Sequence, residues 1–150
     1  MRVVLQRVTT ASVQIEGEIV GAIGLGFMIL LGIEHSDTDE DIDWLCRKIV
    51  AMRVFADEAG LMNKSIEEID GRLLVVSQFT LHAQTKKGNR PSFIQAARPE
   101  QAIPLYEKFI RKLELLSNKP VETGRFGADM KISLVNDGPV TIFMDSKNRE

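Results

Sequence analysis

The residues best suited to chemistry lie together at the end of an apolar segment. Ser77, Gln78 and Thr80 bring three hydrogen-bonding side chains, with Phe79 among them, directly after a run rich in Val and Leu. Polar groups at such a place need partners or face a pocket. As part of a hydrolytic site, Thr80 or Ser77 would be the nucleophile and His82 the only nearby base. The alternative is an ordinary strand that runs out into solvent.

A second candidate is the Gly138-Pro139 peptide within Asn136-Asp137-Gly138-Pro139. Bonds before proline are the ones that adopt the cis form in folded proteins, usually in tight turns. Glycine has no side chain, so its carbonyl is exposed and a ligand can approach closely. A simple turn between two strands explains the same residues.

A short basic loop is the third candidate. Lys86, Lys87 and Arg90 place three cations within five residues, enough to meet a phosphate or two, although most such runs are merely solvated. Phe93 and Phe126 lie near basic residues, and aromatic faces can stack on bases; core packing is the alternative for each.

Composition excludes several classes of protein. Cys46 is the only cysteine, and with His35 and His82 as the only histidines a zinc site lacks ligands. We therefore expect no metal and no cofactor. The net charge of −2 gives no global attraction to nucleic acid, so any RNA contact must depend on a local basic cluster. No apolar run approaches the roughly 20 residues that span a bilayer, so we expect a cytoplasmic protein with no membrane partner.

Periodicity predicts the elements that position these residues. Strands are expected at residues 1–8, 12–16, 18–23 and 25–33, a buried strand at 72–81, and two strands on either side of the turn at 136–139. Ile42, Leu45 and Ile49 mark one face of a helix that starts near Thr38. A second helix is expected from Pro99 to about Ser117, and Pro104 in its first turns would be able to shift or break its start. We expect one α+β domain over residues 1–150, with a mostly antiparallel sheet or open barrel covered by two main helices.

Two motifs resemble a known family. Ser-Gln-Phe-Thr-Leu at 77–81 and Asn-Asp-Gly-Pro-Val-Thr at 136–141 are similar to the paired motifs of the D-aminoacyl-tRNA deacylases, also called D-tyrosyl-tRNA deacylases. The resemblance covers nearly the whole chain and includes the segments 5–8, 87–93 and 127–130. The form of the first motif argues against the sister deacylases, which carry a trans Gly-Pro bond and remain a minor alternative.

The resemblance implies a function and a set of roles. The family hydrolyses D-aminoacyl-tRNA, and glycyl-tRNA with it, as a homodimer with active sites at the interface. Gly138 and Pro139, expected cis, would reach into the partner's pocket, hold the substrate's ammonium group and exclude L-amino acids. Arg7 would support them. Ser77, Gln78, Phe79 and Thr80 would line the pocket for the terminal adenosine, with Phe126 and Met130 beside it, and Lys86, Lys87 and Arg90 would contact the tRNA backbone.

Two mechanisms and two rival functions stay open at this point. The ester would be attacked either by Thr80 or by water that the substrate's own ribose hydroxyl activates, and the lack of a convincing base beside Thr80 favours the water. The rivals are a non-catalytic RNA-binding module and a small-molecule esterase that uses Thr80 and His82.

Overall fold

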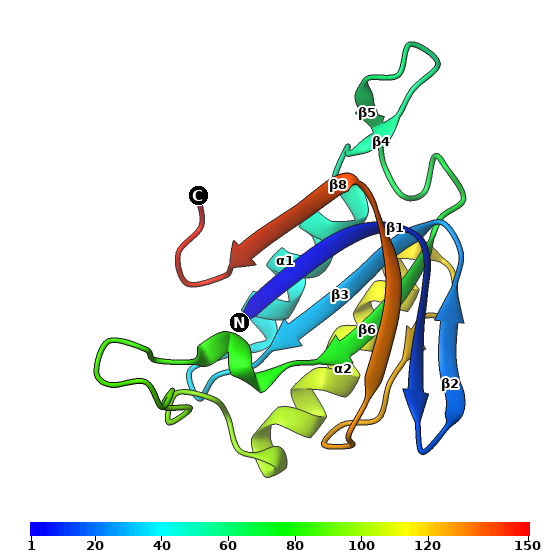
Figure 1. Cartoon of the computed structure of the whole chain (residues 1–150). Coiled ribbons are helices and arrows are strands. Elements are labelled where there is room, and N and C mark those ends of the chain that lie inside the picture. The colour runs from blue at the N-terminus through cyan, green and yellow to red at the C-terminus, as the bar shows by residue number, and fades with distance from the viewer.

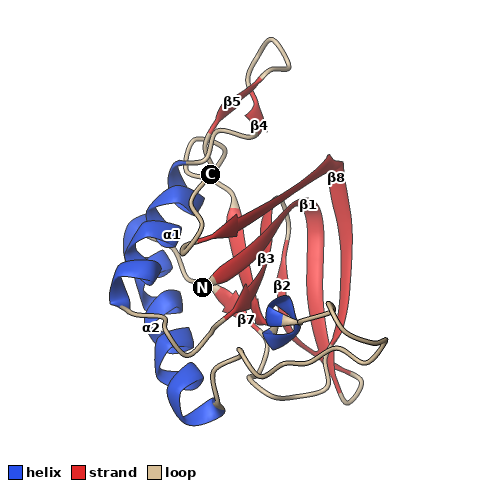
Figure 2. Cartoon of the chain, turned by 90° about the vertical axis from the view of Figure 1, so that its left-hand side faces the viewer, coloured by secondary structure: helices blue, strands red, loops and turns tan.

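The computed structural model describes residues 1–150 as a curved sheet with two helices on one side (Figures 1 and 2). The helices are α1 (Asp39–Ala51) and α2 (Pro99–Ser117), and a short 3-10 helix, η1, spans Phe79–His82. The main sheet contains β1 (Arg2–Ile15), β2 (Glu18–Ile23), β3 (Gly26–Gly32), β6 (Arg72–Ser77), β7 (Glu122–Thr123) and β8 (Lys131–Asp145). A separate small hairpin pairs β4 (Phe55–Ala56) with β5 (Met62–Lys64).

The strand order confirms the expected fold class. The order is β2-β1-β3-β6-β7, with β8 paired to β1 along nearly its whole length. Strand β1 is antiparallel to β2, β3 and β8, whereas β6 runs parallel to both β3 and β7. The sheet is therefore mostly antiparallel and curves into an open barrel, and its two parallel pairs are an addition to the sequence prediction. Neither α1 nor α2 combines the length and apolar character needed to cross a membrane.

The central strands are buried on both faces. Phe27 and Ile29 of β3 pack with α1 and α2, whereas Met28 between them packs inside the barrel. Leu73 and Leu74 of β6 divide in the same way. Successive side chains of a strand point to opposite faces, so two separate cores form on the two sides of the same strands.

The helices follow their predicted positions. In α1, the carboxylate of Asp41 accepts a hydrogen bond from the backbone N–H of Thr38 at 2.8 Å, which closes the first turn. Helix α2 starts at Pro99 and ends at Ser117, as expected, and the next residue, Asn118, is left-handed with φ 52°. Pro104 does not break α2, because it lies close enough to the start that only one early backbone hydrogen bond is lost.

The predicted turn at 136–139 is wrong, because these residues do not connect two strands. The residues lie inside one long strand, β8, whose two halves both pair with β1, and β1 itself is one strand where two were predicted. Gln6 faces Thr141 and Val8 faces Asn136, so the four residues 137–140 stand opposite Arg7 alone. Turn-forming residues inserted into a strand produce a bulge when both flanks keep the same partner. We call residues 137–140 the β8 bulge.

The predicted strand at 72–81 ends early. The last bond to β3 runs from the backbone N–H of Gln78 to the carbonyl of Leu31 at 2.8 Å, and η1 follows at once. Gly32 permits this change of direction, because a Cβ there would lie 2.9 Å from Cβ of Leu81 and 3.0 Å from the carbonyl oxygen of Gln78. The expected alternation of side chains beyond Ser77 therefore does not occur.

Two leucines of α2 offer a matched test of this packing. Leu113 is fully buried, whereas Leu115 is 75% exposed. Leu113→Ala is expected to lower the free energy of unfolding by about 2–5 kcal/mol, since it leaves a cavity, and Leu115→Ala by less than about 0.5 kcal/mol. Urea denaturation of both variants checks this, and equal losses would contradict the assigned helix face.

Candidate active site

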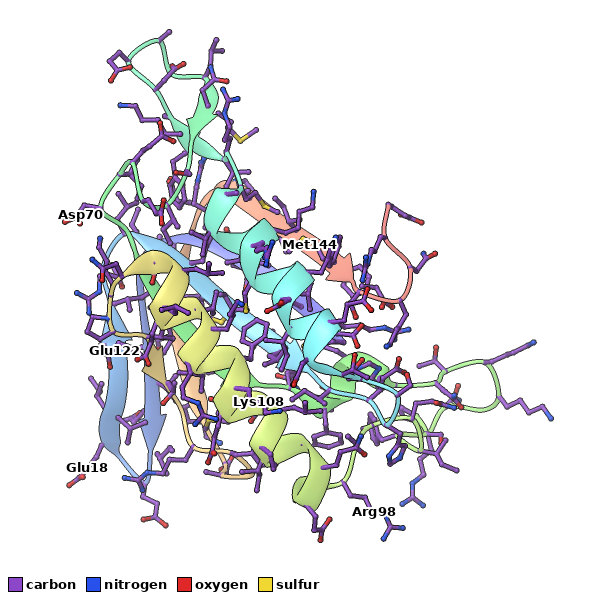
Figure 3. The ribbon with its side chains drawn as sticks, turned by 180° about the vertical axis from the view of Figure 1, so that it is seen from behind. Glu18, Asp70, Arg98, Lys108, Glu122 and Met144 are labelled. Atoms are coloured by element: carbon purple, nitrogen blue, oxygen red, sulfur yellow. The ribbon has the colours of Figure 1, made fainter.

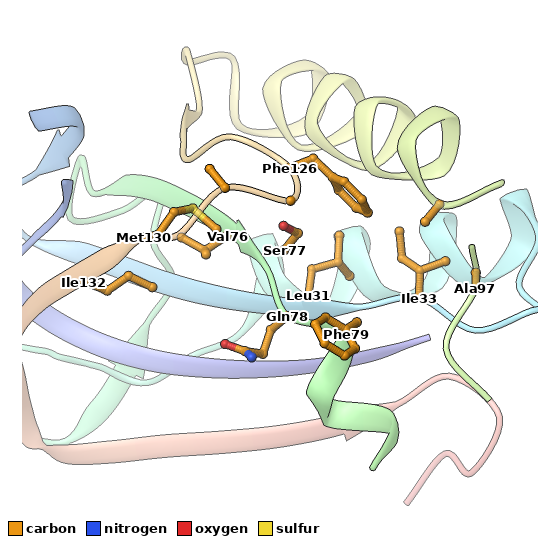
Figure 4. Close-up of a pocket in the computed structure, with 13 residues that line it drawn as sticks. Leu31, Ile33, Val76, Ser77, Gln78, Phe79, Ala97, Phe126, Met130 and Ile132 are labelled. Atoms are coloured by element: carbon orange, nitrogen blue, oxygen red, sulfur yellow. The ribbon is translucent and has the colours of Figure 1, made fainter. Parts of the chain in front are cut away.

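An apolar pocket opens where β3 and β6 end (Figure 4). Its volume is ≈ 260 Å³, and ten of its 13 lining residues are hydrophobic. The walls come from the strand ends, η1, the start of α2 and the segment before β8. The lining residues are Leu31, Ile33, Val76, Ser77, Gln78, Phe79, Ala97, Ala102, Phe126, Gly127, Ala128, Met130 and Ile132. None of these side chains is ionisable, so the pocket itself supplies no acid or base.

The first motif forms one wall of this pocket. Ser77, Gln78 and Phe79 line it, and the ring of Phe79 is 55% exposed. Thr80 does not line the pocket; its hydroxyl oxygen accepts a hydrogen bond from the side-chain amide of Gln78. As the first residues of a 3-10 helix, Phe79 and Thr80 have N–H groups with no acceptor in the helix. The wall therefore offers backbone donors.

His82 is the last residue of η1 and is buried. Its Nδ1 is 3.8 Å from the carboxylate of Glu34, and its Nε2 has no partner in the protein. Burial lowers the pKa of His82, with the backbone of Gly32 opposing the shift. No hydrogen bond joins His82 to Thr80. The nucleophile–base pair considered from the sequence does not form in this structure.

Phe126 and Met130 form the opposite wall, as the motif resemblance implied for their position. The ring of Phe126 packs edge-on against Tyr106 of α2, with ring centroids 5.8 Å apart. The hydroxyl of Tyr106 donates to the carbonyl of Val75 at 3.1 Å, and burial raises its pKa to about 12. A neutral, hydrogen-bonded tyrosine thus fixes Phe126 relative to β6.

Most of the remaining lining residues were missed by the sequence analysis. Leu31, Ile33, Val76, Ala97, Ala102, Gly127, Ala128 and Ile132 come from separate elements and are small or aliphatic. Each looks like an ordinary core residue in its own segment, and only the tertiary arrangement brings them together. No local signal could have identified them.

Gly138 and Pro139 lie at the exposed tip of the β8 bulge, and the peptide bond between them is cis. Arg7 holds the base of the bulge: its Nε donates to the carbonyl of Asp137 at 3.1 Å, and its Nη1 donates to the carbonyl of Val54. Asn136 closes the neck, because its amide donates to the hydroxyl of Thr141 at 2.9 Å. Each residue type in this motif therefore serves the shape of the bulge.

The β8 bulge and the pocket lie at opposite ends of β3. Arg7, which faces the bulge, pairs with Phe27 near the start of β3, whereas Leu31 and Ile33 in the pocket lie at its end. Four residues of strand separate Phe27 from Leu31, which corresponds to roughly 13 Å along β3. A bulge held in this way does not enter the pocket of its own chain.

Five cations in the loop after η1 or next to pocket residues in the sequence have no carboxylate partner. Lys86, Lys87 and Arg90 lie exposed in the loop after η1, which Gln84 and Ser92 close through paired backbone hydrogen bonds of 2.8 and 3.0 Å. Arg98 follows the pocket residue Ala97, and Arg125 precedes Phe126; neither forms an ion pair. On the helices, Lys108 pairs with Asp39 and Lys112 with Asp43. No group of three or more His, Cys, Asp or Glu side chains lies close enough to hold a metal.

The fold and the pocket define a class of small α+β proteins in which an open barrel carries an apolar pocket at one end. A solved structure described as "c-Myc DNA Unwinding Element Binding Protein" shares this fold with a TM-score of 0.91 and 43% identity, covering 97% of this chain and 98% of that one. Another, described as "Structural Analysis of a probable eukaryotic D-amino acid tRNA deacylase", shares the fold with a TM-score of 0.80 at 19% identity over 95% of this chain and 97% of that one.

Sequence comparison then names the family within that class. A family model described as D-Tyr-tRNA(Tyr) deacylase matches residues 4–145. Proteins named D-aminoacyl-tRNA deacylase from Bacteroides thetaiotaomicron and Akkermansia muciniphila are 63% and 62% identical, each over the full length of both chains. The chain belongs to the D-Tyr-tRNA(Tyr) deacylase family, which confirms the resemblance seen in its motifs.

Proposed function

We propose that this protein hydrolyses the ester bond between a D-amino acid and the terminal adenosine of tRNA, in the cytoplasm, and acts on glycyl-tRNA as well. The observation that carries the proposal is the family match over residues 4–145, together with a pocket whose wall is the motif 77–79. Relatives with the same length bear the name D-aminoacyl-tRNA deacylase.

The pocket suits a nucleoside end better than a charged small molecule. It is apolar, with Ser77 and Gln78 as its polar side chains, and such sites bind through shape plus a few oriented hydrogen bonds. Phe79 presents an exposed ring at the mouth, and a base stacked on an aromatic ring gains affinity without sequence readout. Phe126 and Met130 would contact the adenosine from the opposite wall.

Chirality is read, in this proposal, by the β8 bulge of a second subunit. The bulge is exposed and none of its residues lines the pocket of its own chain, so a two-fold partner would be needed to bring a bulge to that pocket. The carbonyls around Gly138 and Pro139 would hold the substrate's ammonium group and leave no room for an L side chain. Glycine has no side chain to exclude, so glycyl-tRNA would be accepted.

The free edge of β8 supports the homodimer. The strand is bonded only to β1, and Val135 and Phe143 on it are 56% and 57% exposed. A long edge with exposed apolar side chains is usually covered in soluble proteins. Because the bulge is part of β8, a second copy that covers this edge would bring the bulges to the interface between the subunits.

Hydrolysis would depend on positioning rather than on a protein base. No ionisable side chain lines the pocket, and the hydroxyl oxygen of Thr80 is already bonded to Gln78. Water activated by the neighbouring ribose hydroxyl would attack the ester, while the N–H groups of Phe79 and Thr80 would stabilise the developing oxyanion. Correct placement of the reacting groups can itself lower the barrier by several kcal/mol.

The unpaired cations around the pocket would hold the tRNA. Lys86, Lys87 and Arg90 are exposed and free of carboxylate partners, so they can neutralise phosphates without breaking an ion pair.

A second candidate function is nucleic-acid binding without hydrolysis, which is favoured by the likeness to a solved structure described as a DNA unwinding element binding protein. That module would bind RNA and leave the ester intact.

The decisive experiment compares hydrolysis of D-tyrosyl-tRNA and L-tyrosyl-tRNA by the purified protein in the presence of a chelator. Loss of the D ester alone is the expected result, because the proposed site excludes L side chains and uses no metal. Release of free tyrosine measures both reactions. Binding of both substrates without cleavage would favour the binding module instead.

Variants of Thr80 and His82 distinguish the mechanisms. Thr80→Ala and His82→Ala are each expected to keep the turnover number within about 10-fold of the parent, whereas loss of a true general base costs about 10²–10⁴-fold. Rates are measured below the melting temperature of each variant, because His82 is buried. A large loss in Thr80→Ala with an acyl-enzyme trapped in the parent would establish nucleophilic attack.

Mixed dimers test whether the site is shared between subunits. One chain carries Gly138→Ala, since Gly138 has φ +121° and a Cβ there would lie 2.8 Å from Nη2 of Arg7. The other carries Gln78→Ala with Phe79→Ala. Each homodimer is expected to be inactive. A 1:1 mixture should recover about a quarter of the parental activity, because about half of the dimers are heterodimers and one of the two sites in each heterodimer is intact. No recovery after proven subunit exchange would place bulge and pocket in the same chain.

Salt dependence tests the basic loop. Replacing Lys86, Lys87 and Arg90 by glutamine is expected to reduce the slope of log K against log salt for tRNA binding by about 0.7–0.9 per lost phosphate contact. Lys108→Gln is the control, because that lysine pairs with Asp39 on the helical layer (Figure 3). An unchanged slope in the loop variants would remove the loop from the RNA-binding surface.

A further inference from the structure

The exposed ring of Phe79 has one aromatic neighbour, Phe93, which is 36% exposed. The two ring centroids are 5.1 Å apart and the ring planes meet at 76°, an edge-to-face contact. This geometry is one of the favourable arrangements of aromatic pairs, because the positive edge of one ring meets the negative face of the other. Phe93 itself does not line the pocket.

The backbone around Phe93 is fixed on both sides. Before it, Ser92 exchanges two backbone hydrogen bonds with Gln84. After it, Ala96 donates to the carbonyl of Phe93 at 3.0 Å, and Ala97 donates to the carbonyl of Ile33 at 2.9 Å. Phe93 is therefore anchored both to the base of the basic loop and to the end of β3, although it lies on the protein surface.

Phe79 is more exposed than its neighbour. It begins a 3-10 helix of four residues, and more than half of its side chain is exposed. A stacking surface must hold its orientation before the base arrives, since ordering it on binding would cost affinity. Contact with the anchored ring of Phe93 supplies that restraint from the side of the loop.

We propose that Phe93 is a positioning residue for substrate binding: it holds the ring of Phe79 in the orientation that stacks on the terminal adenosine. This inference rests on the proposed function of the pocket. It also joins two parts of the RNA-binding surface, because Lys86, Lys87 and Arg90 lie in the loop that Gln84 and Ser92 close immediately before Phe93. Phosphate contacts at the loop and stacking at the pocket are then coupled through one ring contact.

The test is a double-mutant cycle with Phe93→Leu and Phe79→Leu, measured by hydrolysis of D-tyrosyl-tRNA. Phe93→Leu is expected to raise KM by about 2- to 12-fold, the size of an aromatic pair contribution, with kcat unchanged, because stacking is the same in the ground state and the transition state. In the Phe79→Leu background the same change is expected to have no effect. Phe93→Tyr keeps the ring edge and should restore the parental KM.

Ile94→Ala is the matched control. Ile94 is the next residue of the same loop and is 72% exposed, so its removal tests loop composition without touching Phe79. It should leave KM unchanged. Binding of an uncharged RNA ending in adenosine provides a second readout that does not require catalysis, and thermal melting verifies that each variant is folded.

The outcomes separate this inference from the proposed function. Equal KM effects of Phe93→Leu in both backgrounds, or no effect in the parent, would overturn the positioning role while leaving the hydrolase intact. A parent that cleaves neither ester would overturn the proposed function instead. In that case the binding readout still decides whether Phe93 acts through Phe79.

Discussion

The parallel pairing of β3 with β6 is the constraint on which the rest of the structure depends. Both strands are buried on two faces, so the helices and the barrel interior are each built against them. The pairing ends at the bond from Gln78 to Leu31, and β3 ends one residue later at Gly32. Because Gly32 has no side chain, η1 folds directly over the strand end, and that turn supplies one wall of the pocket.

The same strands set the distance between the two motifs of the chain, and this distance argues for an assembly. The pocket lies at the end of β3 and the β8 bulge opposite its start, so a rigid sheet keeps them apart within one subunit. Arg7 prevents the bulge from folding back, because it bonds to both Asp137 and Val54. If the bulge selects substrates as proposed, it would act on a neighbouring subunit, and two-fold symmetry would give each pocket one bulge.

The sequence allowed the helices and most strands to be predicted, and the exceptions share one physical cause. Local signals located Pro99–Ser117 correctly, since helix ends are marked by the residues themselves. Asn136-Asp137-Gly138-Pro139 is a turn by composition, but its flanks stay paired to the same strand and the result is a bulge. Likewise, β6 ends where its partner β3 ends, and no pattern within residues 72–81 predicts the end of β3. Ser77, Gln78, Phe79, Phe126 and Met130, which the resemblance singled out, line the pocket, whereas aliphatic lining residues such as Ile33 and Ala102 have no local signal.

The absence of ionisable side chains from the pocket lining connects the proposed chemistry with the proposed selectivity. A strong general base in the pocket would activate water against any ester that entered, so discrimination would then depend on binding alone. A site that supplies backbone N–H groups and shape accelerates only the substrate whose own hydroxyl and ester are correctly placed. An L-aminoacyl ester displaced by the bulge would lose that placement and, with it, the only source of catalysis. In the proposed site, rejection and rate would therefore follow from one geometric requirement. Few polar residues would then suffice: Ser77, Gln78 and the start of η1 on one subunit, and the bulge held by Arg7 on the other.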